Sequence, residues 1–69
     1  MKLSARNILK AKVVKVTHGA VNSEIVLELA EGTQVVAIIT RQSAETLGLA
    51  EGVDAYAVIK ASNVMIAVD

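Results

Sequence analysis

Apolar and polar residues alternate along most of this chain with the period of a β-strand. The clearest case is Val21–Ala30, where Ile25, Leu27 and Leu29 share one face and the two glutamates point the other way. Four further segments are rich in apolar residues and are also predicted to be strands, although their alternation is less regular: Lys10–Thr17, Gln34–Thr40, Val53–Lys60 and Val64–Val68.

Glycine-containing turns and one short helix connect these segments. Within Thr40–Gly48 the period changes, so we predict a two-turn helix that Thr40 or Ser43 caps and Gly48 ends. The turns are expected at three places, with Gly19 suited to a positive φ in the first of them: His18-Gly19-Ala20, Glu31-Gly32 and Glu51-Gly52.

The order of three strands, a short helix and two strands is that of a five-stranded OB-type barrel. The fold class is therefore all-β with one short helix, in a single domain over residues 1–69. The helix is too short to be stable alone and is expected to plug one end of the barrel. Gln34–Thr40 is apolar on both faces, which predicts either a central strand or one pressed against another subunit.

Composition adds an expectation of self-association. Hydrophobic residues make up 54% of the chain and the mean hydropathy is +0.54, with eleven valines and six isoleucines. A domain of this size buries only about 60% of its unfolded surface. Because there is no cysteine, disulfides cannot stabilise it. We therefore expect an oligomer that buries the surplus apolar surface.

Membrane and export functions do not fit this pattern. The apolar runs are five residues long, far below the roughly 20 needed to span a bilayer. The N-terminal residues have no continuous apolar region, so no signal peptide is predicted and a cytoplasmic location is expected.

Catalysis and general nucleic-acid binding are also disfavoured. His18 is the only histidine and has no evident orienting partner, while Glu24 and Glu28 are separated by about 13 Å on one strand. Net charge is zero and Tyr56 is the only aromatic residue, so a basic groove with stacking platforms is missing. An OB module that regulates or binds nucleic acid within a larger assembly remains the alternative.

Two short polar segments offer donors for an anion. Ser4 and Arg6 provide a hydroxyl and a guanidinium near the start of the chain. Lys60 is the last residue of the predicted strand Val53–Lys60, and Ser62 follows shortly after it. A small dianion needs about two compensating charges plus several hydrogen bonds. From the residues alone, cations on an ordinary wet surface are the favoured interpretation, because no local pattern shows that the two segments meet.

Three blocks of sequence resemble the molbindins, small bacterial proteins that bind molybdate and tungstate. The resemblance covers essentially the whole chain, including a Ser-x-x-x-Leu-Gly segment at 43–48. The same module occurs in molybdate-responsive regulators and molybdate-importer ATPases. The three blocks are 1–7 (MKLSARN), 19–24 (GAVNSE) and 57–65 (AVIKASNVM).

The resemblance implies a homohexamer, a trimer of dimers, with oxyanions bound between OB-type subunits. Ser4, Ala5 and Arg6 of one subunit would meet a lysine-containing segment of its neighbour. That segment is Lys60, Ala61 and Ser62, with backbone help around Val21 and Asn22. A second site near the three-fold axes is placed only as a guess, at Ser43.

The expected function is non-catalytic binding of molybdate or tungstate for intracellular storage and homeostasis. No residue is expected to bind the metal atom directly, and no organic cofactor, nucleic acid or membrane partner is expected. The regulatory or nucleic-acid-binding OB module remains the alternative.

Overall fold

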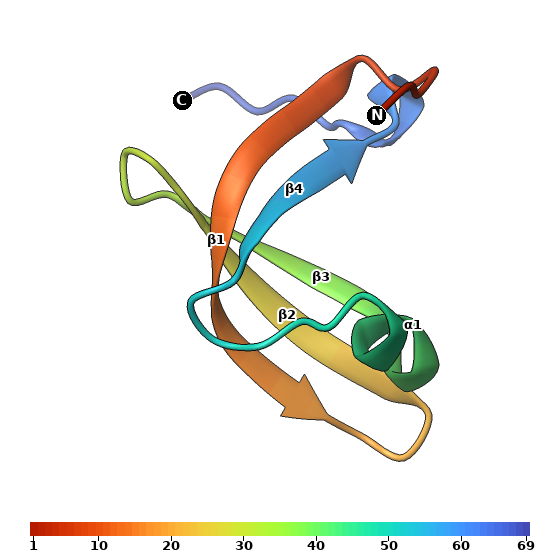
Figure 1. Cartoon of the computed structure of the whole chain (residues 1–69). Coiled ribbons are helices and arrows are strands. Elements are labelled where there is room, and N and C mark those ends of the chain that lie inside the picture. The colour runs from red at the N-terminus through yellow and green to blue at the C-terminus, as the bar shows by residue number, and fades with distance from the viewer.

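Four of the five expected strands form, and they build one curled antiparallel sheet with a short helix at one end (Figure 1). The computed structural model describes all residues from Met1 to Asp69. In sheet order the strands run β3-β2-β1-β4. The elements are β1 (Asn7–His18), β2 (Asn22–Leu29), β3 (Gln34–Thr40), α1 (Arg41–Thr46), β4 (Asp54–Ile59) and the 3₁₀ turn η1 (Ala61–Asn63).

The expected fifth strand, Val64–Val68, is absent, so the prediction of a five-stranded closed barrel is wrong for this chain. The segment lies outside the sheet, with Met65 93% and Ile66 86% exposed. A run of apolar, partly β-branched residues favours a strand, but no strand of this chain lies beside the segment. Because β3 and β4 are not hydrogen-bonded to each other, the curled sheet stays open between them.

The long strand β1 connects β2 and β4, because it pairs with a different strand along each of its two parts. Its C-terminal part pairs with β2 from Ala11 to His18, and its N-terminal part pairs with β4 from Asn7 to Lys12. A bulge between Val13 and Lys15 shifts the register with β2 by one residue. Such a bulge bends a strand and increases its twist. The two parts of β1 therefore face different directions, and the sheet wraps around its core.

The core is small and lies on the inner face of the curled sheet. Val13 and Ile25 are 0% and 2% exposed, and Leu27 is also buried, as the alternation in β2 predicts. On β3 the inward residues are half-buried, whereas Val36 and Ile38 on the outer face are about 60% exposed. Because β3 is an edge strand, the prediction of a central strand is wrong, and the alternative of a contact with another subunit stays a prediction.

Local capping fixes α1 at the end of β3. Thr40 is the N-cap, and its Oγ1 accepts a hydrogen bond from the Ser43 amide at 3.0 Å. At the other end Gly48 has φ +67°, its amide donates to Glu45 O, and the Leu49 amide donates to Ala44 O. This pair of bonds is a Schellman ending, and the predicted end of the helix at Gly48 is confirmed. No helix in the chain has the length and apolar character needed to cross a membrane.

Replacing Thr40 with Ala should lower the free energy of unfolding by about 0.5–2 kcal/mol, because the N-cap bond to the Ser43 amide is lost. Urea denaturation at fixed protein concentration measures the change. The matched control is Thr46→Ala in the last turn of the same helix, where the side chain is exposed and the expected change is within about 0.5 kcal/mol. Equal losses in the two variants would contradict the capping role.

Gly19 is required for a reason different from the one predicted. Positive φ values occur at the glycines of the other turns, Gly32 and Gly52, but not at Gly19. The Gly19 amide instead donates to Asn22 O at 2.7 Å, and a Cβ at this position would approach the same oxygen to 2.9 Å. The close approach of the backbone therefore selects glycine here.

Candidate functional site

The pairing of β1 with β4 brings the two polar segments together within one chain. The last pair of the ladder is Asn7 with Ile59, and Asn7 Nδ2 also donates to Ile59 O at 3.2 Å. The residues just before Asn7 therefore lie beside those just after Ile59. Together they line an open pocket of about 560 Å³: Ser4, Ala5, Arg6, Val58, Lys60, Ala61 and Ser62.

This arrangement corrects one expectation about the site. The resemblance implied that Lys60, Ala61 and Ser62 would come from a neighbouring subunit, but the same chain supplies both segments of the pocket. Antiparallel pairing over the 52 residues that separate Asn7 from Ile59 is the physical reason. A second subunit is therefore not needed to bring Arg6 near Lys60.

The charge of the pocket is positive. Arg6 and Lys60 are its only ionisable lining residues, and neither takes part in an ion pair. The ion pairs of the chain lie elsewhere, between Lys12 and Asp54 at 3.3 Å and within α1. With no carboxylate among its lining residues, the pocket attracts anions.

Neutral donors complete the pocket. In η1 the amides of Asn63 and Val64 donate to preceding carbonyls, whereas those of Ala61 and Ser62 have no acceptor within the chain. The hydroxyls of Ser4 and Ser62 are likewise free of hydrogen bonds to other residues and exposed. Two cations with surrounding amide and hydroxyl donors suit a small oxyanion whose oxygens each accept hydrogen bonds.

Val21 and Asn22 lie at the opposite end of β1 from this pocket. Their carbonyls accept hydrogen bonds from the amides of Arg41 and Gly19, respectively. The ladder joins His18 to Ser23 at that end, about 36 Å along the strand from Asn7. Within one chain they do not contribute to the pocket, so only a second subunit can bring them to it.

Ser43 also lies away from the pocket, in the first turn of α1. Its amide and hydroxyl both bond to Thr40 Oγ1, at 3.0 and 2.8 Å. A neighbouring shallow pocket is lined in part by Val21 and Arg41, but Arg41 Nε is paired with Glu45 Oε1 at 2.9 Å. This second cation is therefore partly neutralised.

Sequence reasoning missed Arg41 and Val58 as pocket-lining residues. Arg41 is the first residue of α1, directly after β3, so its place beside the β1–β2 turn depends on how β2 and β3 pair. Val58 points out of the core next to Lys60. The isolated His18, in contrast, has a specific partner, because its Nδ1 lies 2.6 Å from the Oγ of the buried Ser23. No group of three or more His, Cys, Asp and Glu residues gathers at one place.

Known proteins are similar to this chain over nearly its whole length. The TOBE domain model matches residues 3–66. Molybdenum-pterin-binding protein 3 of Clostridium pasteurianum is 53% identical over 66 residues, which cover 96% of this chain and 97% of that protein. The molybdenum-pterin-binding protein MopA of Rhodobacter capsulatus is 51% identical over 67 residues, and there the match spans 97% of this chain but only 25% of the relative.

Solved structures agree with the fold. MopII of Clostridium pasteurianum, in an apo form, superposes with a TM-score of 0.92 at 46% identity, covering 97% of this chain and 100% of that one. ModG, described as a cytoplasmic molybdate-binding protein and solved with molybdate bound, gives a TM-score of 0.91 at 48% identity, covering 94% and 46% of the two chains. The predicted family resemblance is confirmed: the chain belongs to the TOBE domain family and, within it, to the molybdenum-pterin-binding proteins.

Proposed function

We propose that this protein binds molybdate without catalysis, and tungstate as a close analogue, in the pocket between Arg6 and Lys60. The observation that carries the proposal is the pair of unpaired cations in a pocket without a carboxylate. The names of its relatives support the choice of anion, since ModG was solved with molybdate and others are called molybdenum-pterin-binding. Storage and buffering of the oxyanion in the cytoplasm is the role that we assign to it.

The proposed binding is a matter of charge and donor geometry. Arg6 and Lys60 balance the two negative charges, and the hydroxyls of Ser4 and Ser62 donate to individual oxygens. The backbone amides around Ala5 and Ala61 provide donors with fixed directions. No bond is made or broken, and no residue contacts the metal atom directly, because oxygens surround it.

A second subunit completes this site in the proposal. Val21 and Asn22 are far from the pocket in one chain, and the exposed Val21 is free to approach the pocket of a neighbour. The assembly that we propose is a homohexamer, a trimer of dimers. Exposed apolar side chains on the outer face of β3 and along the C-terminal segment support an association of this kind.

Calorimetric titration tests the function. Molybdate and tungstate should bind with saturation, and sulfate should compete less well if the pocket selects for anion size. A single-stranded oligonucleotide serves as the probe for an OB module of another kind. Binding of the oligonucleotide but not of molybdate would contradict the proposal, and sizing by light scattering should give a mass near six chains in the same samples.

A further inference from the structure

The pairing of β1 with β4 ends where the anion pocket begins. Its last pair is Asn7 with Ile59, and both strands stop there. One further step in the same register sets Arg6 opposite Lys60. Side chains directly opposite each other on an antiparallel pair share one face, and like charges in this relation destabilise the pair. Because no carboxylate lines the pocket, the chain itself does not offset the repulsion between these two cations.

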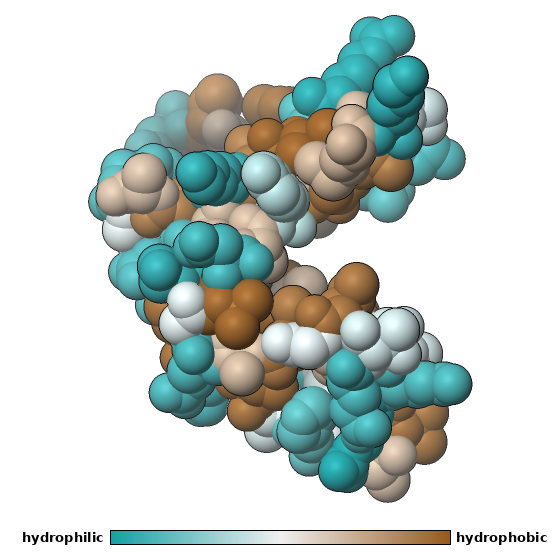
Figure 2. Space-filling view, in the orientation of Figure 1, coloured by the Kyte–Doolittle hydropathy of each residue, from teal (hydrophilic) through white to brown (hydrophobic).

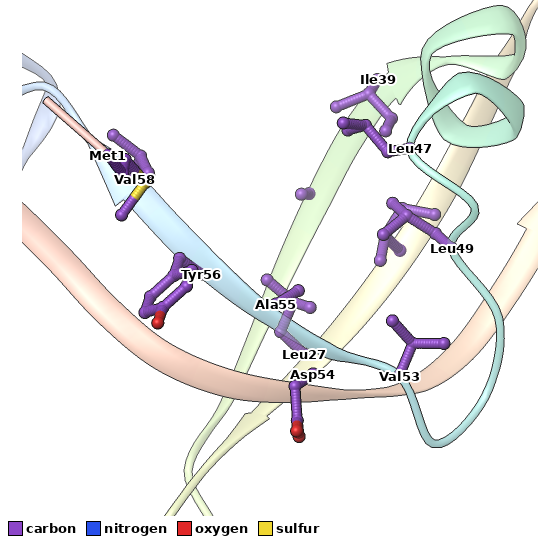
Figure 3. A pocket seen from close by; sticks show the side chains of 12 residues that line it. Met1, Leu27, Ile39, Leu47, Leu49, Val53, Asp54, Ala55, Tyr56 and Val58 are labelled. Atoms are coloured by element: carbon purple, nitrogen blue, oxygen red, sulfur yellow. The ribbon is translucent and has the colours of Figure 1, made fainter. Parts of the chain in front are cut away.

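Within the chain, no strand supports β4 from its other side. β4 pairs only with β1, and it borders an apolar cavity of about 350 Å³. Figure 2 shows this cavity as a notch with apolar walls, and in Figure 3 Tyr56 and Val58 lie on β4 across the notch from Leu47 and Leu49. The position of Lys60, directly after β4, therefore depends on the pairing of β4 with β1.

Few contacts hold the two pocket segments together beyond that pairing. Residues 1–6 lie outside every helix and strand and make no hydrogen bond to the rest of the chain. Met1 lines the apolar cavity but is 76% exposed. The Lys60 carbonyl is used locally, because it accepts from the Asn63 amide. The bond from Asn7 Nδ2 to Ile59 O, at 3.2 Å, therefore reinforces the last pair of the ladder, and no hydrogen bond joins the segments beyond it.

The side chain of Asn7 lies on the face of β1 opposite to the pocket. Asn7 has the same parity as the buried Val13, and no bulge interrupts the strand between them, so both face the inner side of the sheet. Arg6 and Lys60 belong to the outer side, and Asn7 is not among the residues that line the pocket. Asn7 therefore cannot act on an anion directly. It acts through the Ile59 carbonyl, which precedes Lys60 in the chain.

We propose that Asn7 is a positioning residue for the oxyanion pocket. Its bond to the Ile59 carbonyl holds Lys60 beside Arg6 against their mutual repulsion in the anion-free protein. Without this bond, the last pair opens more often, and the apparent affinity falls by the fraction of molecules in which the pocket is closed. The identity of the ligand rests on the proposed function, whereas the repulsion and the bond that opposes it belong to the chain alone.

Asn7→Leu tests the effect on binding. Leucine has nearly the shape of asparagine, lacks the donor and suits the apolar inner face, so the urea midpoint should stay close to that of the parent. The Kd for molybdate should rise about two- to tenfold in titration calorimetry, the range that corresponds to one net hydrogen bond. The matched control is Gln34→Leu, which removes an amide without a hydrogen bond from the first residue of β3 and should leave the Kd unchanged.

Amide hydrogen exchange tests the same role in the absence of any oxyanion. At an ionic strength of about 10 mM, where charges are screened only over about 30 Å, Asn7→Leu should speed exchange at residues 7–9 and 57–59 by about two- to tenfold. Exchange between β2 and β3 should not change. Adding Lys60→Gln to Asn7→Leu should restore most of the protection, because one of the two repelling charges is gone. A purely structural role of Asn7 would not respond to the charge on Lys60.

Three results would overturn the positioning role. These are an unchanged Kd in Asn7→Leu, a failure of Lys60→Gln to restore protection, and faster exchange over the whole sheet together with a lower urea midpoint. A parent protein that does not bind molybdate would refute the proposed function instead, and the exchange experiment would still decide the role of Asn7.

Discussion

Arg6→Ala is expected to weaken molybdate binding by at least tenfold and to leave the fold and assembly intact. The guanidinium is one of two cations in the pocket and takes part in no ion pair, so its main partner would be the anion. A hydrogen bond to a charged group contributes about 1.5–3 kcal/mol, which corresponds to roughly a 10- to 150-fold change in affinity. Titration calorimetry on the variant and the parent measures the ratio.

Lys15→Ala is the matched control for this experiment. It removes the same charge from an exposed position on β1 that lies outside the pocket. If only the overall positive charge of the protein mattered, both variants would lose molybdate affinity to a similar extent. If Arg6 contacts the anion directly, only Arg6→Ala loses affinity. Loss of the oligomer in Arg6→Ala would show instead that this residue supports assembly and would refute the separation of binding from association.

Ile25→Ala is expected to lower the free energy of unfolding by about 2–5 kcal/mol, the range for removing a large buried aliphatic side chain. Ile25 is 2% exposed and is, with Val13, among the largest side chains that are fully buried. Domains have total stabilities of only about 5–15 kcal/mol. The variant should therefore be largely unfolded at urea concentrations well below the midpoint of the parent's unfolding transition. Circular dichroism during urea denaturation follows this loss.

Ile38→Ala on the neighbouring strand tests whether burial is the cause. The substitution is chemically identical, but Ile38 is 61% exposed on the outer face of the sheet. Its expected cost in the dissociated subunit, where this side chain is exposed, is below about 1 kcal/mol. Comparable losses for the two isoleucines would mean that the outer face of β3 is covered in solution as completely as the core.

The sequence pattern predicted correctly those elements whose formation depends on residues close by in the chain. The alternation in β2, the Thr40 cap and the Gly48 ending of α1 each depend on neighbouring residues, and the structure confirms all three. Whether Val64–Val68 forms a strand depends on a partner strand, which a run of apolar residues cannot specify. Gly19 is a second feature that local pattern does not explain. A glycine is needed there because the Asn22 carbonyl lies close by, and not because of a positive φ.

For the candidate site, the sequence identified the right residue types in two segments but not how they meet. Arg6 and Lys60 were recognisable as cations with hydroxyl neighbours, whereas their proximity follows from the register between β1 and β4. Val21 and Asn22 were grouped with them through the resemblance, and the structure places them at the other end of β1. Register between distant strands is set by the packed core, and no short motif encodes it.

The position of β1 between an early and a late partner has a consequence for the order of folding. Its pairing with β2 closes a short loop, whereas its pairing with β4 joins residues as far apart as Asn7 and Ile59. Contacts between distant residues carry a larger loop-closure cost and tend to form late. A nascent chain that has only β1, β2 and β3 in place therefore holds Arg6 without Lys60. The pocket between Arg6 and Lys60 forms only when β4 docks on β1. An oxyanion bound there would therefore stabilise the docked position of β4.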